Sequence, residues 1–183
     1  MDKTRIIALT GPKGVGKTTF SQRLKEESKV LGRIEILRFA GPLKEMLSKA
    51  GILPPQAFTP EGKEDPRYGL CGKTPRWVMQ TLGTEWGRQL IGENIWVEVV
   101  SNQIDRTTAD TVLIDDLRFE NEARMVLDRG GEIWRVEREG IKYSGEHASE
   151  TPIPCDLVSG VIRLGRHDTW LAGQFSGWFD EQR

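Results

Sequence analysis

The chain of 183 residues is 37% hydrophobic and 29% charged, which is the length and balance of one globular α/β domain with a substantial buried core. Its 26 basic and 27 acidic residues are interspersed and give a net charge of -1, which argues against binding of duplex nucleic acid or of an anionic membrane. Cys71 and Cys155 belong to no C-x-x-C pair, so we interpret both as reduced thiols. No apolar run approaches the roughly 18 residues of a spanning helix, so we expect a soluble, cytoplasmic protein.

Short apolar segments alternate with amphipathic stretches, a pattern typical of a parallel sheet covered by helices. The third apolar segment contains Val112, Leu113 and Ile114 and is typical of a fully buried central strand. The five predicted strands are residues 5–10, 34–39, 111–115, 132–136 and 157–162.

Helices are predicted between and after these strands. Phe20, Leu24 and Leu31 mark one face of the first, and Gly32 is predicted to cap it in the left-handed conformation. Two more are predicted to begin at prolines, at Pro42 with a stop at Gly51 and at Thr74-Pro75. Further helices are predicted over 84–91, 94–104, 120–129 and 168–179.

The last predicted helix is rich in aromatic residues. We interpret these as core rather than as a subunit interface, although the sequence leaves open whether the chain forms a homodimer. The residues are Trp170, Phe175, Trp178 and Phe179.

Residues 53–73 form a predicted long loop, because Pro54, Pro55, Pro60 and Pro66 interrupt it. A loop of this length in a compact domain is usually either a functional lid or disordered. We favour a functional role for an insertion spanning about 51–74, because Lys63 and Arg67 are available to meet a phosphate. Arginines that close over a nucleotide are expected either from this loop or from 118–129.

Residues 11–18 read G-P-K-G-V-G-K-T and fit the pattern G-x-x-x-x-G-K-[ST] between a predicted strand and a predicted helix. The glycines let backbone N–H groups surround phosphate oxygens, and Lys17 is expected to reach the β and γ phosphates. The hydroxyl of Thr18 is placed for Mg²⁺. The expected ATP-binding residues are Gly11, Gly14, Val15, Gly16, Lys17, Thr18 and Thr19.

Asp115 and Asp116 end the buried third strand, and parallel sheets bind ligands at the carboxyl ends of their strands. A carboxylate there either holds hydrated Mg²⁺, for which we favour Asp115, or orients an accepting group; the alternative is a cap of the next helix. Arg118 suits a phosphoryl oxygen pair, with an ion pair to Asp116 or Glu122 as the alternative. Lys13 is a second cation in the loop and indicates a second phosphate, unless it is only solvated.

With these residues placed, the chain resembles the deoxynucleoside monophosphate kinases of bacteriophages, a branch of the P-loop nucleoside monophosphate kinases. Four segments after the phosphate loop carry the resemblance, in the same order as in that family. They are F-A-G-P-L-K-E at 39–45, R-W-V-M-Q-T-L-G-T-E at 76–85, Asp116-x-Arg118 with Glu122, and H-A-S-E at 147–150. The resemblance implies a three-layer αβα fold of the P-loop kinase type.

The resemblance also implies roles for single residues. Catalysis is expected of Lys13, Lys17, Asp116 and Arg118. The residues expected around the acceptor nucleotide are Lys13, Leu43, Lys44, Arg67, Arg76, Gly83, Thr84, Trp96, Asp116, Arg118, Phe119 and Glu122. The residues alone leave Trp96 open between stacking on a base and packing in the core. The sequence assigns no role to His147, Ser149 and Glu150.

The chain departs from the family in two places. It is shorter between Gly51 and Thr74 than longer phage relatives, and Trp77 stands where a relative can carry an arginine.

The resulting hypothesis is phosphoryl transfer from Mg-ATP to a deoxynucleoside monophosphate. One alternative is a P-loop kinase of another small acceptor, such as dephospho-coenzyme A or a sugar acid. The other is a nucleotide-dependent regulatory module, although the base-reading motif N-K-x-D is absent from the chain.

Overall fold

The computed structural model describes residues 4–28, 31–143 and 151–165. The chain divides into two compact units, the first formed by Met1–Arg38 with Ser101–Arg183 and the second by Phe39–Val100. The expectation of one domain with an insertion stays a prediction.

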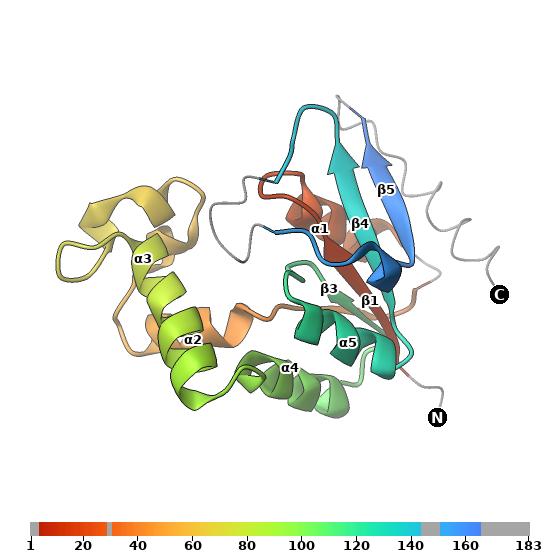
Figure 1. Cartoon of the computed structure of the whole chain (residues 1–183), viewed down its shortest axis with the longest axis horizontal. Helices are drawn as coiled ribbons and strands as arrows, with labels where there is room; N and C mark the ends of the chain where they lie inside the picture. Colours follow the sequence, from red (N-terminus) through yellow and green to blue (C-terminus); the bar gives the residue numbers. More distant parts are fainter. Residues whose placement is uncertain (1–3, 29–30, 144–150, 166–183) are drawn as a thin grey trace. The chain divides into compact units, whose positions relative to one another are not determined.

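The first unit is built on a five-stranded parallel sheet, as the alternating pattern predicts (Figure 1). The strands lie in the order β2-β3-β1-β4-β5. Their bounds are β1 (Arg5–Thr10), β2 (Ile34–Leu37), β3 (Thr111–Ile114), β4 (Glu132–Arg138) and β5 (Gly160–Leu164). All four residues of β3 are buried, which confirms it as an interior strand.

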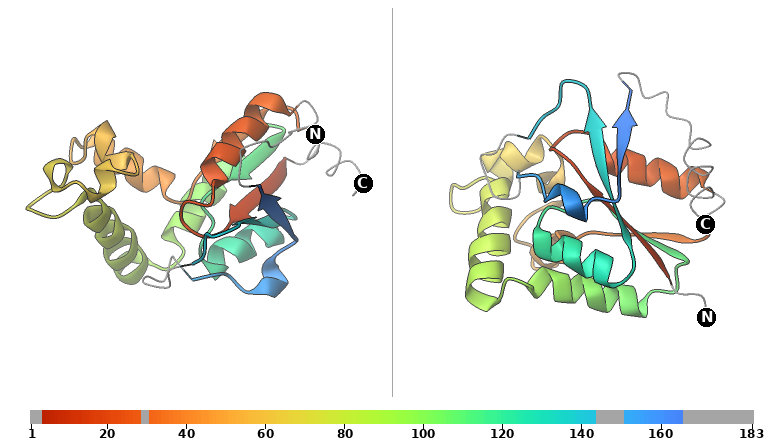
Figure 2. Two further views of the ribbon diagram at one scale, coloured as in Figure 1. Left: turned by 90° about the horizontal axis from the view of Figure 1, so that it is seen from above. Right: turned by 45° about the vertical axis from the view of Figure 1, so that its right-hand side comes forward.

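Helices α1 (Lys17–Glu27) and α5 (Glu120–Asp128) lie on opposite faces of this sheet (Figures 1 and 2). Under α1, apolar side chains of β1, β3, β4 and β5 pack with Phe20 and Leu24 into one buried cluster. Burial of this apolar surface is the main stabilising contribution to the unit. The three-layer α/β architecture predicted from the sequence is therefore confirmed.

Several predicted boundaries in the first unit are wrong, most of them by one or two residues, and the two largest errors are the end of the first helix and the start of the last strand. The first helix ends at Glu27, and Ser28 follows it in extended conformation. Gly32 does adopt the left-handed conformation, with φ 62°, but it serves the turn into β2, where a Cβ would lie 2.6 Å from a carboxylate oxygen of Asp110.

The last strand begins three residues later than predicted, at Gly160, and the 3₁₀ helix η6 (Cys155–Leu157) occupies the expected start. Gly160 packs directly on Trp134, where a Cβ would come within 2.0 Å of the ring. Glycine is therefore required at the position where β5 first pairs with β4, opposite Trp134.

The second unit is helical. Its elements are α2 (Gly41–Lys49), η1 (Pro55–Phe58), η2 (Gly62–Glu64), η3 (Pro66–Tyr68), α3 (Pro75–Gln80), the π-helix η4 (Thr81–Ile91) and the start of α4 (Ile95–Arg106). Leu43, Leu47, Leu53, Ala57 and Trp96 form its buried core. The predicted long loop is thus a series of short 3₁₀ helices, with Leu53 and Ala57 anchored in this core.

The helix starts predicted at prolines are confirmed. Pro42 lies in the first turn of α2, and the Thr74 side chain accepts a hydrogen bond from the Trp77 N–H at the start of α3. The helix predicted from residue 84 begins earlier, at Thr81, directly after α3. The helix predicted over 168–179 and the motif at 147–150 lie outside the described residues. Within the described part of the chain, every helix is too short or too polar to cross a membrane.

Candidate functional site

The loop between β1 and α1 has the backbone geometry of a phosphate-binding loop. Gly11, Gly14 and Gly16 have φ values of 143°, 79° and 106°, which other residues rarely adopt. A Cβ on Gly11 would lie 2.5 Å from the backbone oxygen of Val136 in β4, so glycine is required there for close approach to the neighbouring strand. Gly16 is the N-cap residue of α1, so the loop leads directly into a helix N-terminus, a favourable place for an anion.

Lys17 is held inside this loop. Its Nζ donates to the carbonyl oxygens of Gly11 at 2.6 Å and Pro12 at 3.0 Å, and the residue is only 8% exposed. Among the other expected ATP ligands, Val15 is fully buried, whereas Thr18 and Thr19 are exposed at the start of the helix. Lys13 is exposed on the same loop. The structure therefore places the residues predicted to bind ATP on one loop and on the first turn of α1.

The end of β3 carries a buried ion pair that the sequence analysis missed. Asp115 has a side chain with no exposed surface, and its two carboxylate oxygens accept hydrogen bonds from Nε and Nη2 of Arg38, both at 2.7 Å. The hydrogen bonds that Arg38 donates to the Asp115 carboxylate raise the pKa of Arg38. The pair results from the register of β2 on β3. This register aligns Leu37 with Ile114, so the residues that follow them, Arg38 and Asp115, lie side by side.

Residues 116–122 form a tight connection from β3 to α5. Glu122 is 2% exposed, and its Oε2 accepts hydrogen bonds from the backbone N–H of Arg118 at 2.8 Å and of Phe119 at 3.1 Å. The carboxylate thus caps the helix and fixes the backbone that carries Arg118. The expected roles of Asp116, Arg118 and Phe119 toward the acceptor stay predictions.

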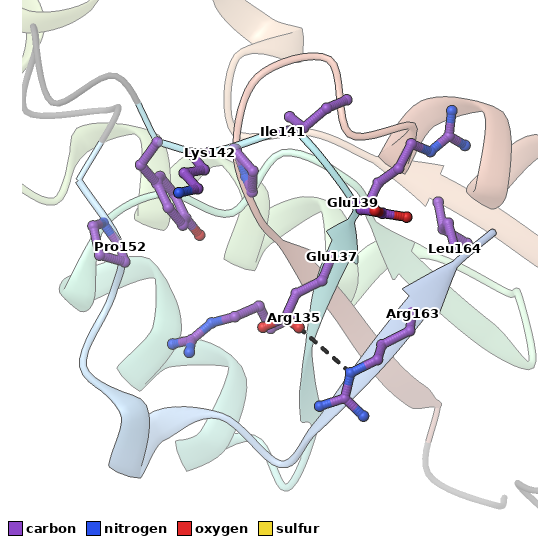
Figure 3. Close-up of a pocket in the computed structure, with 11 residues that line it drawn as sticks. Arg135, Glu137, Glu139, Ile141, Lys142, Pro152, Arg163 and Leu164 are labelled. Carbon is purple, nitrogen blue, oxygen red and sulfur yellow. Dashed lines mark ion pairs between the residues drawn. The ribbon is translucent and has the colours of Figure 1, made fainter. Parts of the chain in front are cut away.

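A pocket of about 640 Å³ lies beside the phosphate loop at the ends of β4 and β5 (Figure 3). Pro12 of the loop lines it, together with basic and acidic side chains and the apolar surfaces of Ile141, Pro152 and Leu164. Glu137 and Arg163 form an ion pair at 3.7 Å at its edge (Figure 3). Tyr143 also lines the pocket, and burial raises the pKa of its phenol.

Arg138 connects this pocket to the loop and was also missed in the sequence analysis. A Cβ on Gly16 would lie 3.2 Å from Nη2 of Arg138 and 3.3 Å from Leu164. The pocket is therefore in direct continuity with the start of α1.

In the second unit, three of the expected acceptor residues pack together. The Trp96 ring is 5% exposed, and its Nε1 donates to the Gly83 carbonyl at 2.9 Å. A Cβ on Gly83 would lie 3.3 Å from Leu43. This packing supports the core interpretation of Trp96, because a buried ring has little free face on which a base could stack.

The expected cations of the second unit lie on its surface. Arg67 is paired with Asp65 at 2.6 Å, and Arg76 is paired with Glu64. Lys44 and Thr84 are partly exposed on α2 and η4. The structure thus presents these side chains at the surface, and their roles toward a nucleotide stay predictions.

The parallel sheet with a glycine-rich phosphate loop after β1 defines a P-loop protein of the α/β class. A family model described as deoxynucleotide monophosphate kinase matches residues 73–163. The chain is 32% identical over 162 residues to a protein of Acanthamoeba polyphaga mimivirus named putative deoxynucleotide monophosphate kinase, a match that covers 81% of each chain. It is 34% identical over 114 residues to the deoxynucleoside-5′-monophosphate kinase of Escherichia phage T5, which covers 58% of this chain and 45% of that relative. The chain belongs to the deoxynucleotide monophosphate kinase family.

Proposed function

We propose that the protein transfers the γ-phosphoryl group of Mg-ATP to the 5′-phosphate of a deoxynucleoside monophosphate, giving ADP and a deoxynucleoside diphosphate. The observation that carries this proposal is the phosphate loop with Lys17 enclosed in it, in a chain of this family. In this proposal the enzyme is cytoplasmic and supplies DNA precursors.

The donor triphosphate would lie along the backbone N–H groups of residues 11–18, with its β and γ phosphates at Lys17. The pocket at the ends of β4 and β5 is continuous with this loop and offers the apolar surfaces of Ile141 and Leu164 to the donor nucleoside. Arg138 beside Gly16 adds positive charge where the phosphates would turn toward the nucleoside.

The chemistry needs no covalent enzyme intermediate, because the attacking phosphate oxygen is already anionic. Catalysis then consists of positioning and of neutralising the charge that builds up between the two phosphates. Lys13, Lys17 and Arg118 supply that charge in our proposal, and Asp116 orients the acceptor.

The side chains near the phosphate loop fit a magnesium ion that is held mainly by phosphate oxygens. Among the described residues there is no cluster of three or more His, Cys, Asp or Glu side chains that would form a metal site of its own. Thr18 is exposed at the first turn of α1 and offers a hydroxyl, the kind of oxygen ligand that Mg²⁺ prefers. The ion would neutralise charge on the transferred group. Asp115 gives both oxygens to Arg38, so in our proposal Thr18 is the protein ligand.

Residues of the second unit are proposed to bind the acceptor nucleotide. Lys44, Arg67, Arg76 and Thr84 are surface residues with polar groups and are proposed to contact it directly. Leu43, Gly83 and Trp96 are proposed to support that surface from the core beneath.

The test is a coupled ADP-release assay with Mg-ATP and each deoxynucleoside monophosphate, its ribo form, dephospho-coenzyme A and sugar acids. We expect ADP release that depends on one or more deoxynucleotides. Release with only a non-nucleotide acceptor would reassign the protein to another small-molecule kinase. Slow hydrolysis that no acceptor stimulates would favour a regulatory module and contradict the proposal.

A further inference from the structure

The ion pair between Arg38 and Asp115 is unlike the other salt bridges of the first unit. Asp115 has no exposed side-chain surface, whereas the side chain of Arg38 is 31% exposed. Two of the five N–H donors of the guanidinium are directed to Asp115, and within the described residues Arg38 makes no further hydrogen bond. One side of the guanidinium is thus fixed by Asp115, and the side chain keeps part of its surface exposed.

The position of this pair in the sheet is the second observation. Ala8 of β1, Ile114 of β3 and Leu37 of β2 are aligned in register, so β2 and β3 end side by side, and β1 continues two residues further to Thr10. Arg38 is the next residue after β2, and the phosphate loop follows β1 two strands away, at a distance of about 10 Å. Phosphoryl transfer requires the two reacting phosphates to approach to about 3–3.5 Å, so a second phosphate beside the donor falls within reach of an arginine at this edge.

From these observations we infer that Arg38 binds the 5′-phosphate of the acceptor and that Asp115 is the residue that positions it. The inference rests on the proposed kinase function. A guanidinium fixed on one side loses little conformational freedom when it binds a phosphate with the other, and its planar fork suits two phosphoryl oxygens.

This assignment also accounts for Asp115. A carboxylate removed from water is costly unless it is paired, and Arg38 supplies that pairing with two hydrogen bonds. A carboxylate engaged in this way is a poor ligand for magnesium, because both oxygens already accept a charged donor. The sequence prediction of Asp115 as a magnesium ligand and the present inference therefore lead to different experimental outcomes.

The test compares Arg38→Met with a matched control, Arg129→Met. Arg129 also forms a two-pronged pair, with Asp105 at 2.8 and 3.1 Å, and its side chain is 27% exposed, but it follows the carboxyl end of α5.

Calorimetric titrations without ATP or Mg²⁺ would use the deoxynucleoside monophosphate with the highest turnover and the same nucleoside without phosphate. Arg38→Met should weaken nucleotide binding roughly tenfold to a hundredfold, the loss expected for a charge-assisted contact. Binding of the nucleoside, and both affinities of Arg129→Met, should stay within about twofold.

Asp115→Asn separates the two roles of the carboxylate. We expect weaker nucleotide binding in the absence of Mg²⁺, an unchanged Mg²⁺ requirement in turnover, and no further loss when Arg38→Met is added. If the Met variant unfolds below the assay temperature, Arg38→Lys provides the same comparison, since it keeps the charge and loses the fork.

Three outcomes would overturn the inference. They are nucleotide affinity within twofold of wild type in Arg38→Met, an equal loss for nucleotide and nucleoside, or an Asp115→Asn protein that changes only its Mg²⁺ requirement. Wild-type protein that releases no ADP with any deoxynucleotide would refute the kinase function itself, and the inference with it.

Discussion

The structures of the two compact units depend on different features of the sequence. In the first, the phosphate loop is specified by residues that are adjacent in sequence, and the positive φ of Gly11 and Gly16 determines the path of the chain. In the second, residues 53–73 contain no such motif. Leu53 and Ala57 hold this segment by packing in one core with residues of α2, which are near in sequence, and with Trp96 of α4, which lies far along the chain. Local backbone geometry therefore defines the candidate chemistry, whereas side-chain packing across long sequence separations defines the surface proposed for the acceptor.

This contrast predicts that the two units respond differently to substitution. A change in the phosphate loop should remove activity and leave the fold intact. A change in the small core of the second unit should reduce stability first, because few buried side chains hold it together.

The largest effect is expected for Lys17→Ala. Loss of the ammonium held at the Gly11 and Pro12 carbonyls should lower turnover roughly a hundredfold to a thousandfold, because it removes charge from the transferred phosphoryl group. The thermal midpoint should change little. The control is Lys25→Ala, an exposed residue of the same helix. Normal kinase turnover in Lys17→Ala would refute the assignment of this loop.

The matching change in the second unit is Trp96→Ala. The ring is buried in the core and hydrogen-bonded to Gly83, so its removal should lower the free energy of unfolding by about 3–5 kcal/mol, measured by urea denaturation. Trp77→Ala is the control, because Trp77 is 49% exposed. Equal losses in the two variants would show that Trp96 is not a core residue.

The same contrast explains which features the sequence could predict. The strands, the loop and the starts of α2 and α3 follow from apolar patterning, glycines and prolines, so they were found with small errors at their ends. The pairing of Arg38 with Asp115 and the approach of Arg138 to Gly16 depend on strand register, which residue patterns alone do not fix. Trp96 shows the same limit, since a tryptophan at helical spacing favours a core role but is also compatible with stacking on a base.

A smaller effect is expected at the turn between β3 and α5, where a local motif depends on one buried carboxylate. Glu122→Ala would leave the N–H groups of Arg118 and Phe119 without this acceptor and should lower the free energy of unfolding by about 1–3 kcal/mol. Glu122→Gln keeps an oxygen in place and should cost less. Exposed Glu120 on the same helix provides the control, Glu120→Gln, with an expected change within about 0.5 kcal/mol. If Glu122 instead acts only on the acceptor, its loss will raise the acceptor KM without changing the urea midpoint.

The smallest effect on stability is expected at the start of β2. There the side chain of Asp110, the residue before β3, bonds to the backbone just after the turn at Gly32. Its Oδ2 accepts the backbone N–H of Arg33 at 2.7 Å, and this hydrogen bond lowers the pKa of Asp110. A lowered folded-state pKa stabilises the fold at pH values above the ordinary pKa of the carboxyl, and the stabilisation is lost as the pH falls through the lowered value. Asp110→Asn should therefore lower the urea midpoint slightly at pH 7. Its difference from wild type should shrink as the pH falls below about 4, where the carboxyl group of the unfolded wild-type chain takes up a proton before that of the folded chain. Glu26→Gln, an exposed change on α1, is the control. A difference between Asp110→Asn and wild type that is the same at pH 7 and pH 3 would mean that the side-chain charge does not contribute to this junction.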